Sequence, residues 1–142
     1  MTHVSAEARI EAPAERIWAR LTDFGEYGRW NAMHTGFPDG GPATLELGAA
    51  YRENMKLMGF PAEVAWTVHE FEAGRVLAVR GAGPMGVMVG NRYSLTPDGD
   101  ATWVRIDGDF TGAAVSLMAA RLTDSATAAL QESLRKLGGL VG

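Results

Sequence analysis

The sequence predicts an α+β domain in which a strongly curved antiparallel sheet of six to seven strands wraps around one long C-terminal helix. Three observations carry this prediction. A segment with period-two alternation opens the chain, further strand-like segments follow with only turns between them, and the chain after Gly112 has helical periodicity. Because no helix separates the later strands, we expect them to pair antiparallel, which is typical of the α+β class.

The length and composition indicate one domain over residues 1–142. The chain is 46% hydrophobic, and at this length about two thirds of the unfolded surface can be buried, so a core forms without disulfides or metals. Cysteine is absent, which excludes a disulfide framework, thiol catalysis and thiolate metal sites. We therefore expect a cytoplasmic protein without a cofactor.

The charge distribution argues against nucleic acid as a partner. The formal net charge is -4, and acidic and basic residues are interspersed, so no polybasic stripe is available for phosphate backbones or anionic lipid surfaces. Residues 1–7 have neither a basic region nor an apolar one, so no signal peptide is expected. Apolar runs fall far short of the roughly 20 residues of a membrane span.

The first third of the chain predicts one strand followed by two short helices. Residues 4–12 alternate between apolar and polar side chains, as in a strand with one buried face. Pro13 suits a first helical turn, and apolar residues then recur at helical spacing, so a short helix is expected over residues 13–21. Residues 23–31 contain two glycines and predict one further irregular or short helical turn.

The middle of the chain predicts a meander of hairpins. A turn-rich loop over residues 36–42 precedes a brief expected strand at residues 44–47. The firmest turn is Pro97–Asp100, because proline presets one dihedral angle and Gly99 supplies a positive one. Short turn segments that contain glycine or proline separate the other strands, which are expected at residues 51–58, 62–71, 75–81, 87–95 and 102–110.

The C-terminal segment predicts a single long amphipathic helix beginning after Gly112. Gly138 and Gly139 mark its expected end. About 24 helical residues would span roughly 36 Å, enough to cross a small sheet. The apolar stripe of this helix consists of Leu117, Met118, Leu122, Ala126, Ala129, Leu130, Ser133, Leu137 and Leu140.

This architecture predicts a hollow. One helix can seal a sheet of six or seven strands only if the sheet curls around it, and a deep curl leaves space where an apolar ligand can bind. Seven methionines and four tryptophans are available to line it, and methionine adapts to ligands of imprecise shape. The alternative is that these residues are ordinary core fillers. The candidate lining residues are Trp30, Met33, Met55, Met58, Trp66, Met85, Met88, Met118 and Leu122.

Two stretches carry a family resemblance. Residues 10–24 with Tyr-Gly-Arg-Trp-Asn at 27–31 resemble the START-like polyketide cyclase/dehydrase superfamily, which has the helix-grip fold also found in the birch pollen allergen. Residues 58–68, with 93–97 and 102–104, are similar to an actinobacterial branch in which some members are labelled toxins of toxin-antitoxin pairs. The resemblance covers essentially the whole chain. It implies a helix-grip, ligand-binding domain in a superfamily of lipid carriers, hormone receptors and aromatase/cyclases.

The sequence contains no strong catalytic motif. His3, His34 and His69 lack the short spacings of a zinc site, so no metal is expected. A nucleophile elbow and a phosphate-binding loop are both absent. The glycine-rich stretch 81–86 joins two predicted strands, and Pro84 lacks the amide that a phosphate would need, so this stretch is expected to be a loop that could act as a lid.

A small set of polar residues remains as candidates for the hollow. Alternation places some of them on the solvent face, because strand neighbours point to opposite sides. Glu53 shares a strand face with Tyr51 and Met55 and is the best exception, although a surface role is expected ahead of catalysis even there. His69 is the second weak catalytic candidate. The full set is Glu53, His69, Arg80, Asn91, Arg92, Asp107 and Asp109.

Three functions follow from this reasoning. The first is binding, carriage or sensing of an apolar small molecule such as a lipid, an isoprenoid or a polyketide-like compound. The second is a polyketide cyclase or dehydratase, which would require two or more acid-base groups touching the hollow. The third, a toxin or protein-interaction role, rests only on how some similar proteins are labelled. The expected partner is the apolar ligand, and a homodimer is left open.

Overall fold

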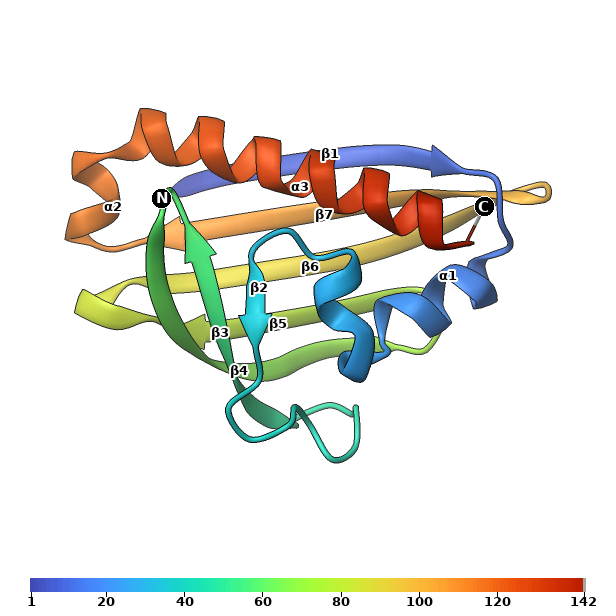
Figure 1. The fold of residues 1–142 in the computed structure, drawn as a ribbon, viewed down its shortest axis with the longest axis horizontal. Helices are drawn as coiled ribbons and strands as arrows, with labels where there is room; N and C mark the ends of the chain where they lie inside the picture. The colour runs from blue at the N-terminus through green and yellow to red at the C-terminus, as the bar shows by residue number, and fades with distance from the viewer. Residues whose placement is uncertain (142) are drawn as a thin grey trace.

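A seven-stranded antiparallel sheet forms most of the molecule, as the computed structural model of residues 1–141 shows (Figure 1). The strand order is β1-β7-β6-β5-β4-β3-β2, so the first strand lies beside the last one. This confirms the predicted meander. The strands are β1 (Thr2–Ile10), β2 (His34–Gly36), β3 (Ala50–Leu57), β4 (Phe60–Glu72), β5 (Val76–Ala82), β6 (Met88–Asp98) and β7 (Ala101–Thr111).

Helices cover the concave face of this sheet. The short helices after β1 are α1 (Ala14–Leu21) and the 3-10 helix η1 (Phe24–Arg29), as predicted, and Pro13 precedes α1 with its preset φ of -68°. A short 3-10 turn, η2 (Pro84–Gly86), connects β5 and β6. The chain ends with α2 (Ala113–Leu117) and the long α3 (Ala119–Val141).

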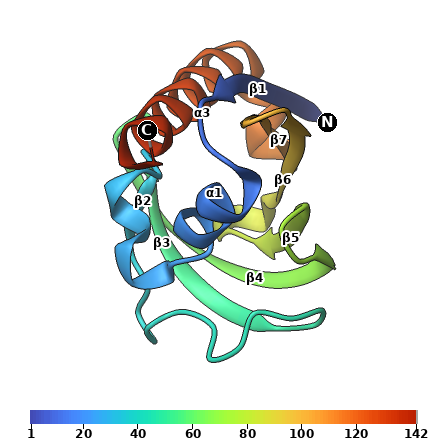
Figure 2. The same ribbon diagram turned by 90° about the vertical axis from the view of Figure 1, so that its right-hand side faces the viewer.

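The sheet curls around α3, which runs along β1 and over the concave face (Figures 1 and 2). The view along the sheet shows α1 closing one end of the curl. The opposite end is covered by α2 and by the β5–β6 connection. The predicted helix-grip architecture is confirmed, and it gives the concave face two differently covered ends.

The prediction of a strand at residues 44–47 is wrong. These residues form bends and a turn, and Gly48 has a φ of 85°, which suits a turn rather than a ladder. The short strand lies earlier in the chain, at β2, where His34 pairs with Met55. This three-residue edge strand is too short for a periodicity signal.

The C-terminal helix also differs from the prediction in two respects. Met118 leaves the helical conformation, with φ -132° and ψ 26°, and so separates α2 from α3. Gly138 and Gly139 do not end α3, which continues to Val141. Two helical glycines cost about 1 kcal/mol each, and burial of Leu137 and Val141 on either side of them offsets that cost.

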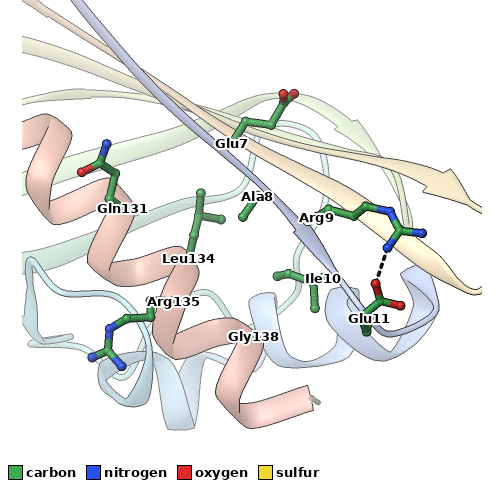
Figure 3. A pocket seen from close by; sticks show the side chains of 9 residues that line it. All are labelled: Glu7, Ala8, Arg9, Ile10, Glu11, Gln131, Leu134, Arg135 and Gly138. Carbon is green, nitrogen blue, oxygen red and sulfur yellow. Dashed lines mark hydrogen bonds and ion pairs between the residues drawn. The ribbon is translucent and has the colours of Figure 1, made fainter.

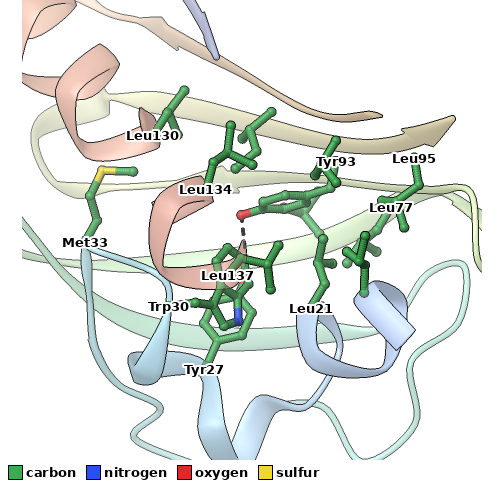
Figure 4. Close-up of a cluster of buried hydrophobic side chains, with 14 of the residues drawn as sticks. Leu21, Tyr27, Trp30, Met33, Leu77, Tyr93, Leu95, Leu130, Leu134 and Leu137 are labelled. Carbon is green, nitrogen blue, oxygen red and sulfur yellow. Dashed lines mark hydrogen bonds between the residues drawn. The ribbon is translucent and has the colours of Figure 1, made fainter. Parts of the chain in front are cut away.

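An aromatic core fills the α1 end of the concave face. Its members pack by tilted, stacked and edge contacts, and the Tyr27 and Tyr93 hydroxyls lie 3.3 Å apart (Figure 4). Leu137 of α3 is fully buried in the same region. The aromatic core consists of Phe24, Tyr27, Trp30, His34, Phe37, Tyr51 and Tyr93.

Candidate functional site

An apolar pocket of about 440 Å³ lies between the sheet and the start of α3. Strands β3 and β4 with their connecting turn supply one wall, the β5–β6 connection a second, and α2 with the start of α3 a third. Its lining residues are Met33, Met55, Leu57, Met58, Phe60, Pro61, Ala62, Val64, Trp66, Gly83, Pro84, Met85, Val87, Val89, Asn91, Phe110, Ala114, Val115, Met118 and Leu122.

The structure brings together most of the residues that the sequence singled out. Seven of the nine candidates line the pocket, although their role in ligand binding stays a prediction. Trp30 does not line it, because its ring is 1% exposed inside the aromatic core. Met88 is half-exposed, because strand alternation places its neighbour Val89 in the pocket wall instead. The seven are Met33, Met55, Met58, Trp66, Met85, Met118 and Leu122.

Several lining residues were not identified from the sequence. Val89 and Phe110 pair across β6 and β7 and both face the pocket, and Ala114 and Val115 come from the short α2. Strand alternation on β6 could have identified Val89, since Val89 and Asn91 lie on the same face of the strand. No signal in the sequence marked α2 as a separate wall.

The pocket offers almost no polar chemistry to a ligand. Its only amide side chain is Asn91, and the indole nitrogen of Trp66 is already hydrogen-bonded to Glu53. None of its lining residues carries a carboxylate, an imidazole, an amine, a guanidinium or a hydroxyl group. The site can therefore remove apolar surface from water and orient one polar group of a ligand through Asn91.

Glu53 lies behind the pocket wall. It faces inward, as its strand face predicted, and its side chain is buried. One carboxylate oxygen accepts a hydrogen bond of 2.9 Å from Trp66 Nε1, and the other lies 2.7 Å from His34 Nδ1. A buried carboxylate needs such partners to offset its loss of hydration. Glu53 therefore fixes the orientation of the Trp66 ring and does not itself line the pocket.

The tyrosines next to this carboxylate do not provide bases. Burial raises the pKa of Tyr27 well above the ordinary phenol value, and the negative charge of Glu53 adds to the effect. Burial likewise raises the pKa of Tyr51 and of Tyr93. All three phenols stay protonated at neutral pH and act as hydrogen-bonding and packing groups.

The other polar candidates lie on the outer surface. His69 is exposed at a bulge where the register of β4 against β5 shifts between Val68 and Glu70, so it is not placed to act in the pocket. Arg80 is exposed, and Arg92 forms an ion pair of 3.0 Å with Glu70. Two further carboxylates face His3 rather than the pocket, those of Asp107 and Asp109.

Two methionines of the pocket have unusual backbone conformations. Met58 has a φ of 54° and Met85 a φ of 58°, and they are the two non-glycine residues with positive φ in the described chain. Long side chains are uncommon in this region, and such strain gathers at ligand clamps and switch regions. Both residues lie on loops that line the pocket, one in the β3–β4 turn and one in η2.

A second groove of about 450 Å³ runs between β1 and α3 (Figure 3). Charged side chains line it, and several pair with one another or with neighbours. Arg9 contacts Glu11 and donates to Asp98 at 3.0 Å, and Arg135 is bonded to Glu132. Three of its four charged side chains, those of Arg9, Glu11 and Arg135, are therefore already paired, and the groove is a solvated surface depression.

Metal and membrane features are absent from residues 1–141. In that part of the chain, no three potential metal ligands among histidine, cysteine, aspartate and glutamate come together. None of the helices there combines the length and apolar character needed to cross a membrane.

Comparison with known proteins gives one family match. The model of a family described as "Polyketide cyclase / dehydrase and lipid transport" matches residues 1–141. No curated protein matches the chain.

Several solved structures share the fold. A START superfamily protein from Mycobacterium smegmatis is 21% identical with a TM-score of 0.75, and the match covers 99% of this chain and 97% of that one. The Zhui aromatase/cyclase from Streptomyces sp. R1128 is 18% identical with a TM-score of 0.73, over 98% and 92%. A protein from Thermus thermophilus is 18% identical with a TM-score of 0.75, over 98% and 96%. At these identities the likeness concerns the fold alone.

Proposed function

Since the chain belongs to the polyketide cyclase/dehydrase and lipid transport family, we propose that it binds an apolar small molecule in the pocket under α2 and α3. The ligand class is a lipid, an isoprenoid or a polyketide-like compound. One observation carries the proposal: among the 20 lining residues, only Trp66 and Asn91 have a side-chain nitrogen or oxygen atom, and the indole N–H of Trp66 is already bonded to Glu53.

The dimensions and the composition of the pocket support this class of ligand. Its volume of about 440 Å³ lies within the usual range for small-molecule sites. Met33, Met55, Met58, Met85 and Met118 supply flexible thioether chains to the wall, which can adapt to ligands of different shape. Binding is then driven by apolar burial, with Asn91 available to orient one carbonyl or hydroxyl group of the ligand.

A cyclase or dehydratase reaction is the second candidate. It is favoured by the family description and by the buried Glu53–His34 pair, which lies one side chain behind the pocket wall at Trp66. General acid-base catalysis needs a group within hydrogen-bond reach of the substrate, however, and the lining supplies only an amide. Binding is therefore the conclusion we adopt. The toxin interpretation stays a prediction that no comparison tests.

A filled pocket tests the proposed function. Val89→Trp places a large ring in the pocket from a strand whose direction is fixed, and Thr96→Trp adds the same ring on the exposed face of the same strand. We expect Val89→Trp to weaken binding of an apolar fluorescent probe at least about tenfold, because the ring occupies the space that the probe needs. Native mass spectrometry of the purified protein would identify a retained ligand.

Two outcomes would contradict the proposal. The wild type could fail to bind any apolar probe or to retain any ligand, or Val89→Trp and Thr96→Trp could bind the probe equally well. Circular dichroism spectra of both variants would establish that they are folded before binding is compared.

A further inference from the structure

Exposed apolar side chains gather at the mouth of the pocket. Apart from Met1, the most exposed large apolar side chains are Leu117 at 89%, Met85 at 81% and Phe60 at 69%. Each belongs to a different segment: Leu117 ends α2, Met85 lies in η2, and Phe60 follows the β3–β4 turn. The three segments lie at the same end of the molecule, on the left in Figure 1, and all contribute to the pocket wall. Exposed apolar groups that cluster in this way mark an interaction surface.

The composition of these segments indicates which class of partner the surface would bind. We define the mouth as residues 57–61, 83–87 and 113–118, in which Ser116 is the only polar side chain. A protein partner would exchange hydrogen bonds at roughly one per 100–200 Å² of interface, whereas lipid hydrocarbon requires none. The mouth therefore suits a bilayer better than a protein surface.

The charges next to the mouth are consistent with an anionic surface. Residues 55–62, 82–90 and 110–122 contain Lys56 and Arg121 and no acidic residue, although the chain as a whole has 17 acids and 13 bases. Both cations are exposed. The chain has no polybasic stripe, but the two cations around the mouth would be attracted to an anionic membrane rather than repelled by it.

We propose that the mouth docks on an anionic lipid bilayer, with Phe60, Met85 and Leu117 inserted among the lipids and Lys56 and Arg121 near the headgroups. This inference rests on the proposed function, because a docked mouth lets an apolar ligand pass between membrane and pocket without crossing water. Docking of this size is reversible, since a few side chains bury far less surface than a membrane anchor.

Vesicle sedimentation with matched leucine variants tests the proposal. Wild-type protein is expected to bind vesicles of phosphatidylcholine mixed with phosphatidylglycerol more strongly than vesicles of phosphatidylcholine alone. Leu117→Asp should lower binding about tenfold or more, because it replaces an inserted apolar group with a charge. Leu47→Asp is the control, since Leu47 is similarly exposed at 66% but belongs to the β2–β3 connection. Lys56→Gln combined with Arg121→Gln should weaken binding only to the anionic vesicles.

The possible results are distinguishable. Wild-type protein that binds neither vesicle, or equal losses in Leu117→Asp and Leu47→Asp, would overturn docking. A wild-type dimer that Leu117→Asp converts to a monomer would overturn it in favour of a second copy of the chain at the mouth. Leu117 does not line the pocket, so probe binding in solution should survive Leu117→Asp. Loss of probe binding in all proteins would reject the proposed function and leave the vesicle result to stand independently.

Discussion

The two ends of the concave sheet face are lined by different types of residue. At the α1 end, rings and leucines pack against one another, and Trp30 and Leu137 are almost completely buried. At the α2 end, methionines, valines and alanines surround a pocket of about 440 Å³, and several of them remain exposed. One end holds the fold together and the other leaves room for a ligand.

The difference follows from which helices cover each end. Helix α1, η1 and the C-terminal half of α3 bring large side chains onto the sheet at one end, as Figure 4 shows for the core. The other end receives only the five-residue α2, the η2 turn and the first turns of α3. Aromatic rings have few rotamers and fill space rigidly, whereas methionine side chains are flexible. The tightly packed core and the pocket proposed to bind a ligand therefore lie at separate ends.

The largest expected effect comes from removing a ring of the aromatic core. Trp30→Ala should lower the free energy of unfolding by about 3–5 kcal/mol, because it leaves a large cavity in a well-packed region. Met118→Ala, at the pocket end and partly exposed, should lower it by less than about 1 kcal/mol. Urea unfolding followed by far-UV circular dichroism measures both. Equal losses would show that the pocket end contributes as much stability as the core.

An intermediate effect is expected from Glu53→Gln, at the border between the two ends. Glutamine has one carbonyl oxygen and one NH2 group in place of the two carboxylate oxygens, so the atom that faces either Trp66 Nε1 or His34 Nδ1 changes from an acceptor to a donor. We therefore expect a loss of about 1–3 kcal/mol. The indole proton resonance of Trp66 in an NMR spectrum should shift as well. Glu63→Gln, which removes an exposed partner of Arg52, is the control and should leave stability nearly unchanged. Equal stability of Glu53→Gln and Glu63→Gln would contradict the role of Glu53 in positioning the Trp66 ring.

The smallest expected effect is a gain in stability. Met58 and Gly59 form a two-residue hairpin turn with φ values of 54° and 80°, a position where asparagine is favoured over methionine. Met58→Asn should raise the free energy of unfolding by about 1 kcal/mol and weaken apolar probe binding, because it puts an amide in the pocket wall. Met58→Leu should keep the affinity without the gain in stability. A variant Met58→Asn that is neither more stable nor weaker in binding would refute this interpretation.

Much of the fold was predictable because it depends on local patterns. Alternation identified β1 and the later strands, and helical spacing identified α1 and α3. The strand face of Glu53 was also correct, since alternation alone sets it. The strand expected at residues 44–47 failed because turn geometry at Gly48 outweighed a weak propensity.

The sequence by itself determined the order of the elements, the curved sheet around one long helix and the supply of methionines. Only the tertiary structure decided that Trp30 belongs to the packed core while Met33, close to it in the chain, lines the pocket. It also decided that Glu53 supports Trp66 and that the segments carrying Phe60, Met85 and Leu117 lie at one end of the pocket (Figure 1). The physical reason is that periodicity reports which face of an element is buried, whereas the partners of that face depend on contacts between residues far apart in the chain.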